Sequence, residues 1–192
     1  HGPGKDHIEY HEANPNEKNS RFMSVPSKLS RQQQMEICGQ CHNGATILKG
    51  DAFRFRPGDA LSDHYSPSPN KGEENSVHTS NQMQRLMESQ CFQKSEMGCV
   101  ECHNPHRNER GDMQLFSKRC LECHDSEHCG MAQQVGDTLA ENCVDCHMPK
   151  RASAKHLRMH SVSGSVFPPL RDHYIRVDQQ ATDKFLRSLK SK

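Results

Sequence analysis

One spacing, repeated four times, decides the fold of this chain: Cys38-Gly39-Gln40-Cys41-His42, Cys99-Val100-Glu101-Cys102-His103, Cys120-Leu121-Glu122-Cys123-His124 and Cys143-Val144-Asp145-Cys146-His147. We number these stretches frames 1 to 4 in chain order. Each frame has two cysteines three positions apart and a histidine directly after the second, and together they use eight of the ten cysteines. This regularity indicates that one kind of group is bound four times.

Cys-x-x-Cys-His is the spacing that attaches haem c. Two thiols on one helical turn reach the two vinyl groups of a porphyrin, and the histidine that follows binds the iron. A zinc half-site or a redox dithiol also uses Cys-x-x-Cys, but neither explains a histidine after every pair, and a disulfide framework would show variable spacings. We therefore predict four haem c groups, with thioether bonds from Cys38, Cys41, Cys99, Cys102, Cys120, Cys123, Cys143 and Cys146 and proximal iron ligands His42, His103, His124 and His147.

The chain has too few apolar side chains to form an ordinary hydrophobic core. Only 32% of the 192 residues are apolar, against about 45–50% in ordinary domains, Trp is absent and the mean hydropathy is −0.97. Such a chain buries too little apolar surface to offset the entropy of ordering it. Four flat, apolar porphyrins would replace the missing core, and in a chain this short each lies close enough to another to form a conduction path.

Other bulk properties exclude several classes of protein. The formal net charge of +1 gives no field that would attract a nucleic acid. No run of about 18 apolar residues is present, which predicts no transmembrane segment. The chain starts at His1 without an initiator Met or a signal peptide, which indicates a processed or partial product. Covalent haem attachment indicates a periplasmic or extracellular protein.

We predict a mainly α fold with extensive irregular loops and little or no β structure. It would be a small multihaem cytochrome c fold, organised around four stacked haems in a single domain over residues 1–192. Within this domain we expect an N-terminal extension (1–30), a haem-binding core (31–147) and a C-terminal wrap and helix (148–192).

Local patterns place three helices. Ser30 and Gln33 have the spacing of a capping box, which predicts a helix over 31–41 that delivers frame 1. A second helix starts near residues 79–82, and its methionine-rich apolar stripe is interpreted as packing against haem. A last helix runs from about Asp178. We expect frames 2 to 4 to form a tight cluster, with frame 1 set apart by the long loop that follows it.

Ten histidines remain beyond the four proximal ones, and this surplus favours imidazole as the sixth iron ligand. His106 stands three residues after His103 and cannot easily fold back onto the far face of its own haem, so it would ligate a neighbouring one. Methionine is the alternative ligand and would raise the reduction potential. We predict bis-His, low-spin haems of low potential. The distal candidates, best first, are His106, His173, His78, His160, His7 and His128.

Cys91 and Cys129 lie outside the frames. An oxidising compartment favours a disulfide that joins the segment before frame 2 to the segment after frame 3. Two buried free thiols are the alternative, and cysteine ligation of an iron is a third reading.

The chain resembles multihaem c-type cytochromes related to the tetrahaem electron carrier of ammonia oxidisers, including forms associated with tetratricopeptide repeats. The resemblance implies that His106 and His173 are distal ligands. In that family His-Gly-Pro-Gly usually follows Cys-x-x-Cys, whereas here no cysteine precedes His1. Either a longer parent carried a fifth haem, or His1 binds a haem of another chain, or its amine and imidazole form a copper site. The matching stretches are His1-Gly2-Pro3-Gly4-Lys5-Asp6-His7, Cys99 to His106, Cys143 to Lys150 and Arg171-Asp172-His173.

Electron transfer through the four haems is the function that these patterns predict. The partners would be redox proteins, or copies of this chain in a homo-oligomer or filament. The alternative is a multihaem oxidoreductase with one open-coordinate haem that acts on a small nitrogen compound. Such an enzyme needs an open iron position and acid or base groups beside it. No Cys-x-x-Cys-Lys variant marks a distinct active haem, so we predict a protein that is not an enzyme.

Overall fold

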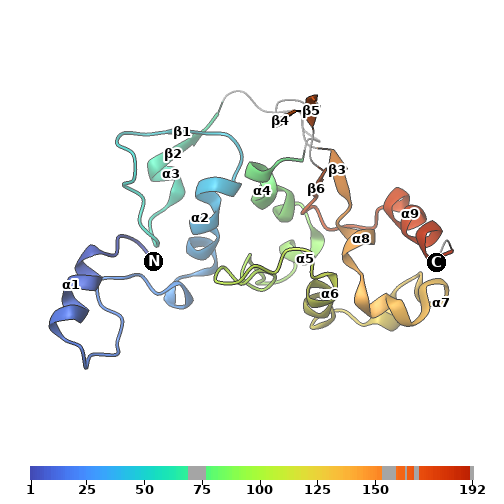
Figure 1. Ribbon diagram of the computed structural model, residues 1–192, viewed down its shortest axis with the longest axis horizontal. Coiled ribbons are helices and arrows are strands. Elements are labelled where there is room, and N and C mark those ends of the chain that lie inside the picture. The colour runs from blue at the N-terminus through green and yellow to red at the C-terminus, as the bar shows by residue number, and fades with distance from the viewer. Residues whose placement is uncertain (69–76, 153–158, 163, 167–168, 191–192) are drawn as a thin grey trace.

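The computed structural model extends along one long axis, with helix α1 at one end and helix α9 at the other (Figure 1). The structure describes residues 1–68, 77–152, 159–162, 164–166 and 169–190; the side chains of 159–161, 165 and 166 also lie outside the description. Among the described residues, no helix is long and apolar enough to cross a membrane.

The described part of the chain is mainly helical, which confirms the predicted fold class at that level. The helices are short and are joined by irregular segments. The α-helices are α1 (Lys5–Ala13), α2 (Arg31–His42), α3 (Leu61–His64), α4 (Gln82–Met87), α5 (Gln90–Gln93), α6 (Met113–Leu121), α7 (Ala132–Val135), α8 (Val144–His147) and α9 (Gln179–Lys190). The 3-10 helices are η1 (Pro26–Lys28), η2 (Thr79–Asn81), η3 (Ser126–His128) and η4 (Gly136–Glu141).

Six strands of three residues each form three antiparallel pairs. The pairs are β1 (Thr46–Leu48) with β2 (Tyr65–Pro67), β3 (Lys150–Ala152) with β6 (Pro169–Arg171), and β4 (Met159–Ser161) with β5 (Gly164–Val166). Pairs this short cannot carry a core on their own. The prediction of little β structure therefore holds.

The capping signals are the part of the helix prediction that the structure confirms best. Ser30 caps α2 with a complete capping box: its Oγ accepts from the Gln33 N–H, and the Gln33 side chain accepts from the Ser30 N–H at 3.0 Å. The predicted last helix is α9, and Asp178 caps it by accepting from the Ala181 N–H at 2.9 Å. The predicted second helix is broken in two, because Ser89 adopts an extended backbone between α4 and α5.

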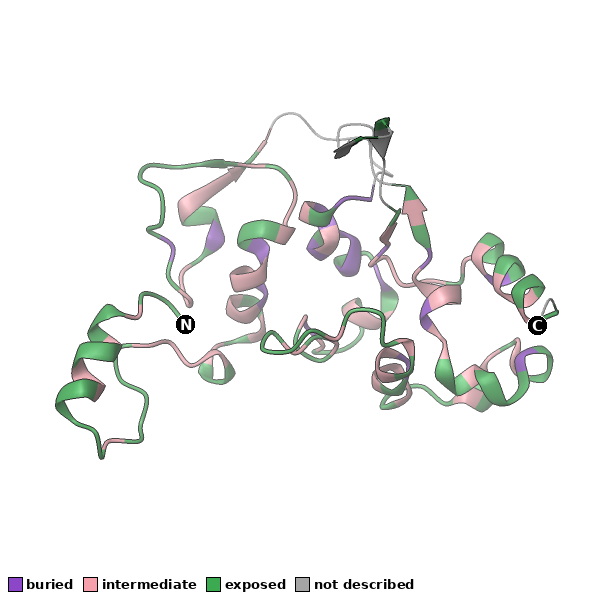
Figure 2. Ribbon diagram, viewed as in Figure 1, coloured by how far each residue is buried: buried purple, intermediate pink, exposed green. Residues whose placement is uncertain are grey.

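A small apolar core lies between α2 and α4. Met35, Met83 and Leu86 pack together there, and five other hydrophobic side chains are buried elsewhere in the described chain. Figure 2 shows buried residues concentrated near the middle of the molecule, while the segments at both ends are mostly exposed or half-buried. The described part of the polypeptide therefore has no large hydrophobic core of its own, as the composition predicts.

Candidate haem-binding sites

Every frame forms a single turn: frames 1 and 4 lie in α-helices, frame 3 starts at the end of α6, and frame 2 is a turn outside the helices. Frame 1 is the last turn of α2, and frame 4 enters α8. In frames 2, 3 and 4 the histidine N–H donates to the carbonyl of the first cysteine, at 2.9, 3.0 and 3.1 Å. Residues three apart on a helical turn are neighbours, so the two cysteines of each frame lie side by side with the histidine next to them. This backbone is the one that attachment of a porphyrin requires.

Two of the predicted proximal ligands have an imidazole that is oriented for iron. Nδ1 of His42 lies 2.7 Å from the Thr79 carbonyl, and Nδ1 of His147 lies 3.1 Å from the Arg176 carbonyl. A carbonyl oxygen can only accept, so Nδ1 carries the proton in both rings. Nε2 then holds the lone pair with which a histidine binds a metal.

His173 forms the clearest pair with a proximal ligand. Its ring centroid lies 6.0 Å from that of His103, and the planes differ by 28°. A nitrogen–metal bond is about 2 Å long and the ring centroid lies about 1 Å behind the nitrogen, so imidazoles on opposite sides of one metal have centroids about 6 Å apart. The pair therefore has the separation of two axial ligands on one iron.

His173 is also in the protonation state that binds iron. Burial lowers its pKa to about 4, which leaves the imidazole neutral at pH 7. Its Nδ1 lies 3.3 Å from the Arg171 carbonyl, the same arrangement as in His42 and His147. The structure thus brings together two residues that the sequence analysis singled out, 70 positions apart in the chain.

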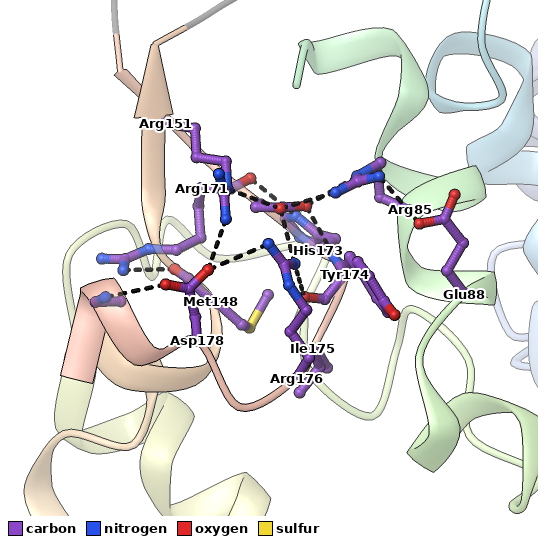
Figure 3. A network of polar contacts seen from close by, with 12 residues as sticks. Arg85, Glu88, Met148, Arg151, Arg171, His173, Tyr174, Ile175, Arg176 and Asp178 are labelled. Carbon is purple, nitrogen blue, oxygen red and sulfur yellow. Dashed lines mark hydrogen bonds and ion pairs between the residues drawn. The ribbon is translucent and has the colours of Figure 1, made fainter. Parts of the chain in front are cut away.

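A buried carboxylate holds the backbone beside His173 (Figure 3). Asp172 is fully buried, and Arg85 binds both of its oxygens, at 3.0 and 2.9 Å. Arg176 and Arg151 lie 3.1 and 3.3 Å from Oδ2 of the same carboxylate. Burial alone would raise the pKa of Asp172, but the hydrogen bonds from Arg85, Tyr174 and Arg176 bring it below its usual value.

Ser89 binds the main chain on both sides of Tyr174, in the segment that carries His173. Its hydroxyl donates to the His173 carbonyl at 3.2 Å and accepts from the Ile175 N–H at 2.8 Å. Ser89 is fully buried, and it follows α4, the helix that carries Arg85. Arg85 in α4 and Ser89 just after it therefore hold the segment that carries His173. The sequence analysis missed Arg85 and Ser89, because nothing local to either residue signals a partner more than 80 positions away.

The four frames are joined in series by direct contacts. Cys99 of frame 2 lies beside Cys38 of frame 1, and its thiol donates to the Met35 sulfur of α2, the helix that carries frame 1, at 3.4 Å. Arg119, just before frame 3, donates to the Cys102 carbonyl of frame 2 at 2.6 Å. Ser117 of α6 accepts from the Cys143 N–H of frame 4 at 2.9 Å. The expectation that frame 1 is set apart is wrong: the loop after α2 folds away and leaves frame 1 against frame 2.

The other distal candidates lie elsewhere. His78 is buried at the start of η2 beside the Ser80 hydroxyl, His7 bonds through Nδ1 to the Arg21 carbonyl at 2.7 Å, and His128 is exposed near Asp125. Among the described residues, no ring pair joins His7 or His128 to a frame histidine. His160 belongs to β4, but its side chain is outside the described residues. His106 pairs with His1, at 6.0 Å and 26°.

Cys91 and Cys129 are not joined in the structure. All ten cysteines are free thiols, and both of these are half-buried. Cys91 lies near Cys102 and Cys120, whereas Cys129 lies near Cys146. The two cysteines therefore accompany different frames, and the disulfide between them stays a prediction.

Comparison with family models, curated proteins and solved structures finds no match to this chain. The interpretation of the frames therefore rests on their own geometry. No group of three or more His, Cys, Asp or Glu side chains in the described part of the chain could hold a bare metal ion. A haem iron is different, because the porphyrin supplies four ligands and the protein only two. The paired histidines fit that demand.

Proposed function

We propose that this protein transfers electrons through four covalently bound haem c groups that stack along the series of frames. The observation that carries the proposal is the pairing of His103 in frame 2 with His173 at the separation of two axial iron ligands. The four one-turn frames and the contacts that join them support it. Bis-His ligation makes the haems low-spin and of low potential, and a periplasmic or extracellular location follows from the covalent attachment.

The haem would supply one-electron chemistry, and the protein would supply attachment, axial ligands and surroundings. The cysteines of each frame hold one porphyrin in place. The frame histidine binds the iron from one side, and Nδ1 hydrogen bonds to main-chain carbonyls fix the ring in two frames. Arg85, Asp172 and Ser89 hold His173 on the opposite side of the haem at frame 2.

Electrons would enter and leave where the frames reach the surface. Cys41 of frame 1 and Cys123 and His124 of frame 3 are exposed. Porphyrins attached at these frames would have edges that a partner can approach. The partners we propose are redox proteins, or other copies of this chain in a homo-oligomer or filament.

The test combines a haem count with the spin state of the iron. Intact mass and the pyridine haemochrome spectrum should give four covalent haems per chain, and electron paramagnetic resonance of the oxidised protein should show only low-spin signals. The His173→Ala variant should convert one haem of the four to high-spin, whereas His128→Ala, at an exposed position, should convert none. Fewer than four covalent haems would overturn the proposal, and a high-spin wild type would favour an enzyme.

A further inference from the structure

A second histidine pair repeats the geometry of the His103–His173 pair but contains no frame histidine. The ring centroids of His1 and His106 are 6.0 Å apart and their planes differ by 26°, against 6.0 Å and 28° for the first pair. Both separations match the distance of about 6 Å between the centroids of two imidazoles that bind one metal from opposite sides.

The His1 ring is held as a ligand would be. Its Nδ1 lies 3.0 Å from the Ser24 carbonyl, which can only accept a hydrogen bond, so Nδ1 bears the proton and Nε2 keeps the lone pair. His42, His147 and His173 have the same arrangement. The His1 carbonyl accepts from the Ser24 N–H at 3.0 Å, so two hydrogen bonds fix this residue.

The His106 ring is carried by the loop that follows frame 2. Its N–H donates to the Asn104 side chain at 2.9 Å, which closes a tight turn after His103. In Figure 1 this loop, between α5 and α6, reaches back toward the N-terminal part of the molecule. The turn therefore places one histidine at frame 2 and the next against the N-terminal segment.

A bare metal ion does not suit this pair. A protein site for zinc uses three or four ligands from the chain, and no cluster of three candidate ligands occurs among the described residues. A chelate through the terminal amine and Nδ1 of His1 would compete with the hydrogen bond to Ser24. An iron porphyrin needs only two imidazoles, so it is the ligand whose chemistry matches the site.

We propose that His1 and His106 are the two axial ligands of a fifth haem, which none of the four frames attaches. The inference rests on the proposed function, because it takes the other histidine pair to be an iron site. It assigns His106 to an iron beyond the four. The fifth haem would lie near frame 2, beside the N-terminal segment.

The test uses the full chain with its covalent haems. Intact mass after denaturation counts the haem bound to the frames, and pyridine haemochrome counts all haem. We expect either total haem of five per chain as isolated, or uptake of one equivalent of added haemin with a low-spin spectrum. Extraction with acidic acetone separates a dissociable fifth haem from one bonded to a polypeptide. Zinc or copper added without porphyrin should not bind at one equivalent.

Variants identify the site. His106→Ala should weaken binding of the fifth haem at least tenfold and leave the spectra of the four covalent haems unchanged, and His128→Ala should bind like the wild type. His106→Met should restore binding with a Met-to-iron charge-transfer band. The inference is overturned if haemin does not bind, if it binds equally to His106→Ala, or if loss of His106 makes a covalent haem high-spin. Fewer than four covalent haems would instead overturn the proposed function.

Discussion

Asp172 holds a charge that water does not screen, because its side chain is fully buried. Three guanidinium groups compensate this charge, and Arg85, itself only 6% exposed, binds both carboxylate oxygens. Removing one partner of a buried ion pair is far more costly than replacing the whole pair, since the other charge remains buried and uncompensated. The cluster therefore stabilises the fold at the point where it also positions His173.

The Asp172→Asn variant tests this role. We expect it to lower the free energy of unfolding by about 3–5 kcal/mol, because the buried Arg85 guanidinium loses the carboxylate that binds its Nε and Nη2 and keeps only the half-exposed Glu88. Urea unfolding of the haem-loaded protein measures the change. The control is Asp51→Asn, at an exposed position that makes no hydrogen bond or ion pair among the described residues. Equal stability of the two variants would show that Asp172 does not hold this segment.

Helix α2 has a complete N-terminal cap but buries few side chains. Most of its side chains are half-buried or exposed, and only Met35 and Gly39 are buried. The capping box at Ser30 satisfies N–H groups that the helix itself leaves unpaired. Since α2 ends in frame 1, fraying at its start would reach the first cysteine of that frame about two turns later.

Ser30→Ala should therefore destabilise the protein by about 1 kcal/mol, the usual effect of losing an N-cap. Thermal or urea unfolding followed at the haem absorption measures the effect. Ser27→Ala is the matched control, because Ser27 is exposed and makes no hydrogen bond within the part of the chain that the structure describes. If both variants have the wild-type midpoint, the cap contributes nothing to α2.

Elements with a local signal are the ones that sequence predicts. Capping residues mark the starts of α2 and α9, and both helices form where expected. The sequence analysis missed α1 and α6. No side chain of α1 is buried and none caps it, so neither periodicity nor a capping residue reveals it. Asp112 does cap α6, by accepting from the Leu115 N–H at 2.9 Å, and this signal was available in the sequence.

In the candidate sites, too, the residues of local patterns could be predicted and the long-range pairs could not. The frames are local patterns, so the sequence predicts their cysteines and histidines, and the structure shows them as single turns. The axial pairs are not local. The residues next to His106 and His173 in the sequence marked both as candidate ligands. Which histidine each one faces depends on how distant segments pack in the fold. Counting histidines could not place His173 opposite His103 or His106 opposite His1.

The molecule as a whole is short of apolar contacts. Eight hydrophobic side chains are buried in the described part of a 192-residue protein, and the largest apolar cluster is centred on three of them. Burial of this extent cannot offset the conformational entropy of ordering so long a chain. Four porphyrins between the helices would supply the missing apolar contacts, and their covalent bonds would also restrict the unfolded chain.

The chain should therefore collapse only when its haems are attached. A compact chain of this length has a radius of gyration of about 16 Å and an unfolded one about 47 Å. Small-angle X-ray scattering should place the haem-loaded protein near the lower value. A variant with serine at all eight frame cysteines should approach the upper one, whereas serine at Cys91 and Cys129, outside the frames, should stay compact. If the variant with eight serines is compact and unfolds cooperatively, the polypeptide core is sufficient for folding. The haems would then bind to a protein that folds without them.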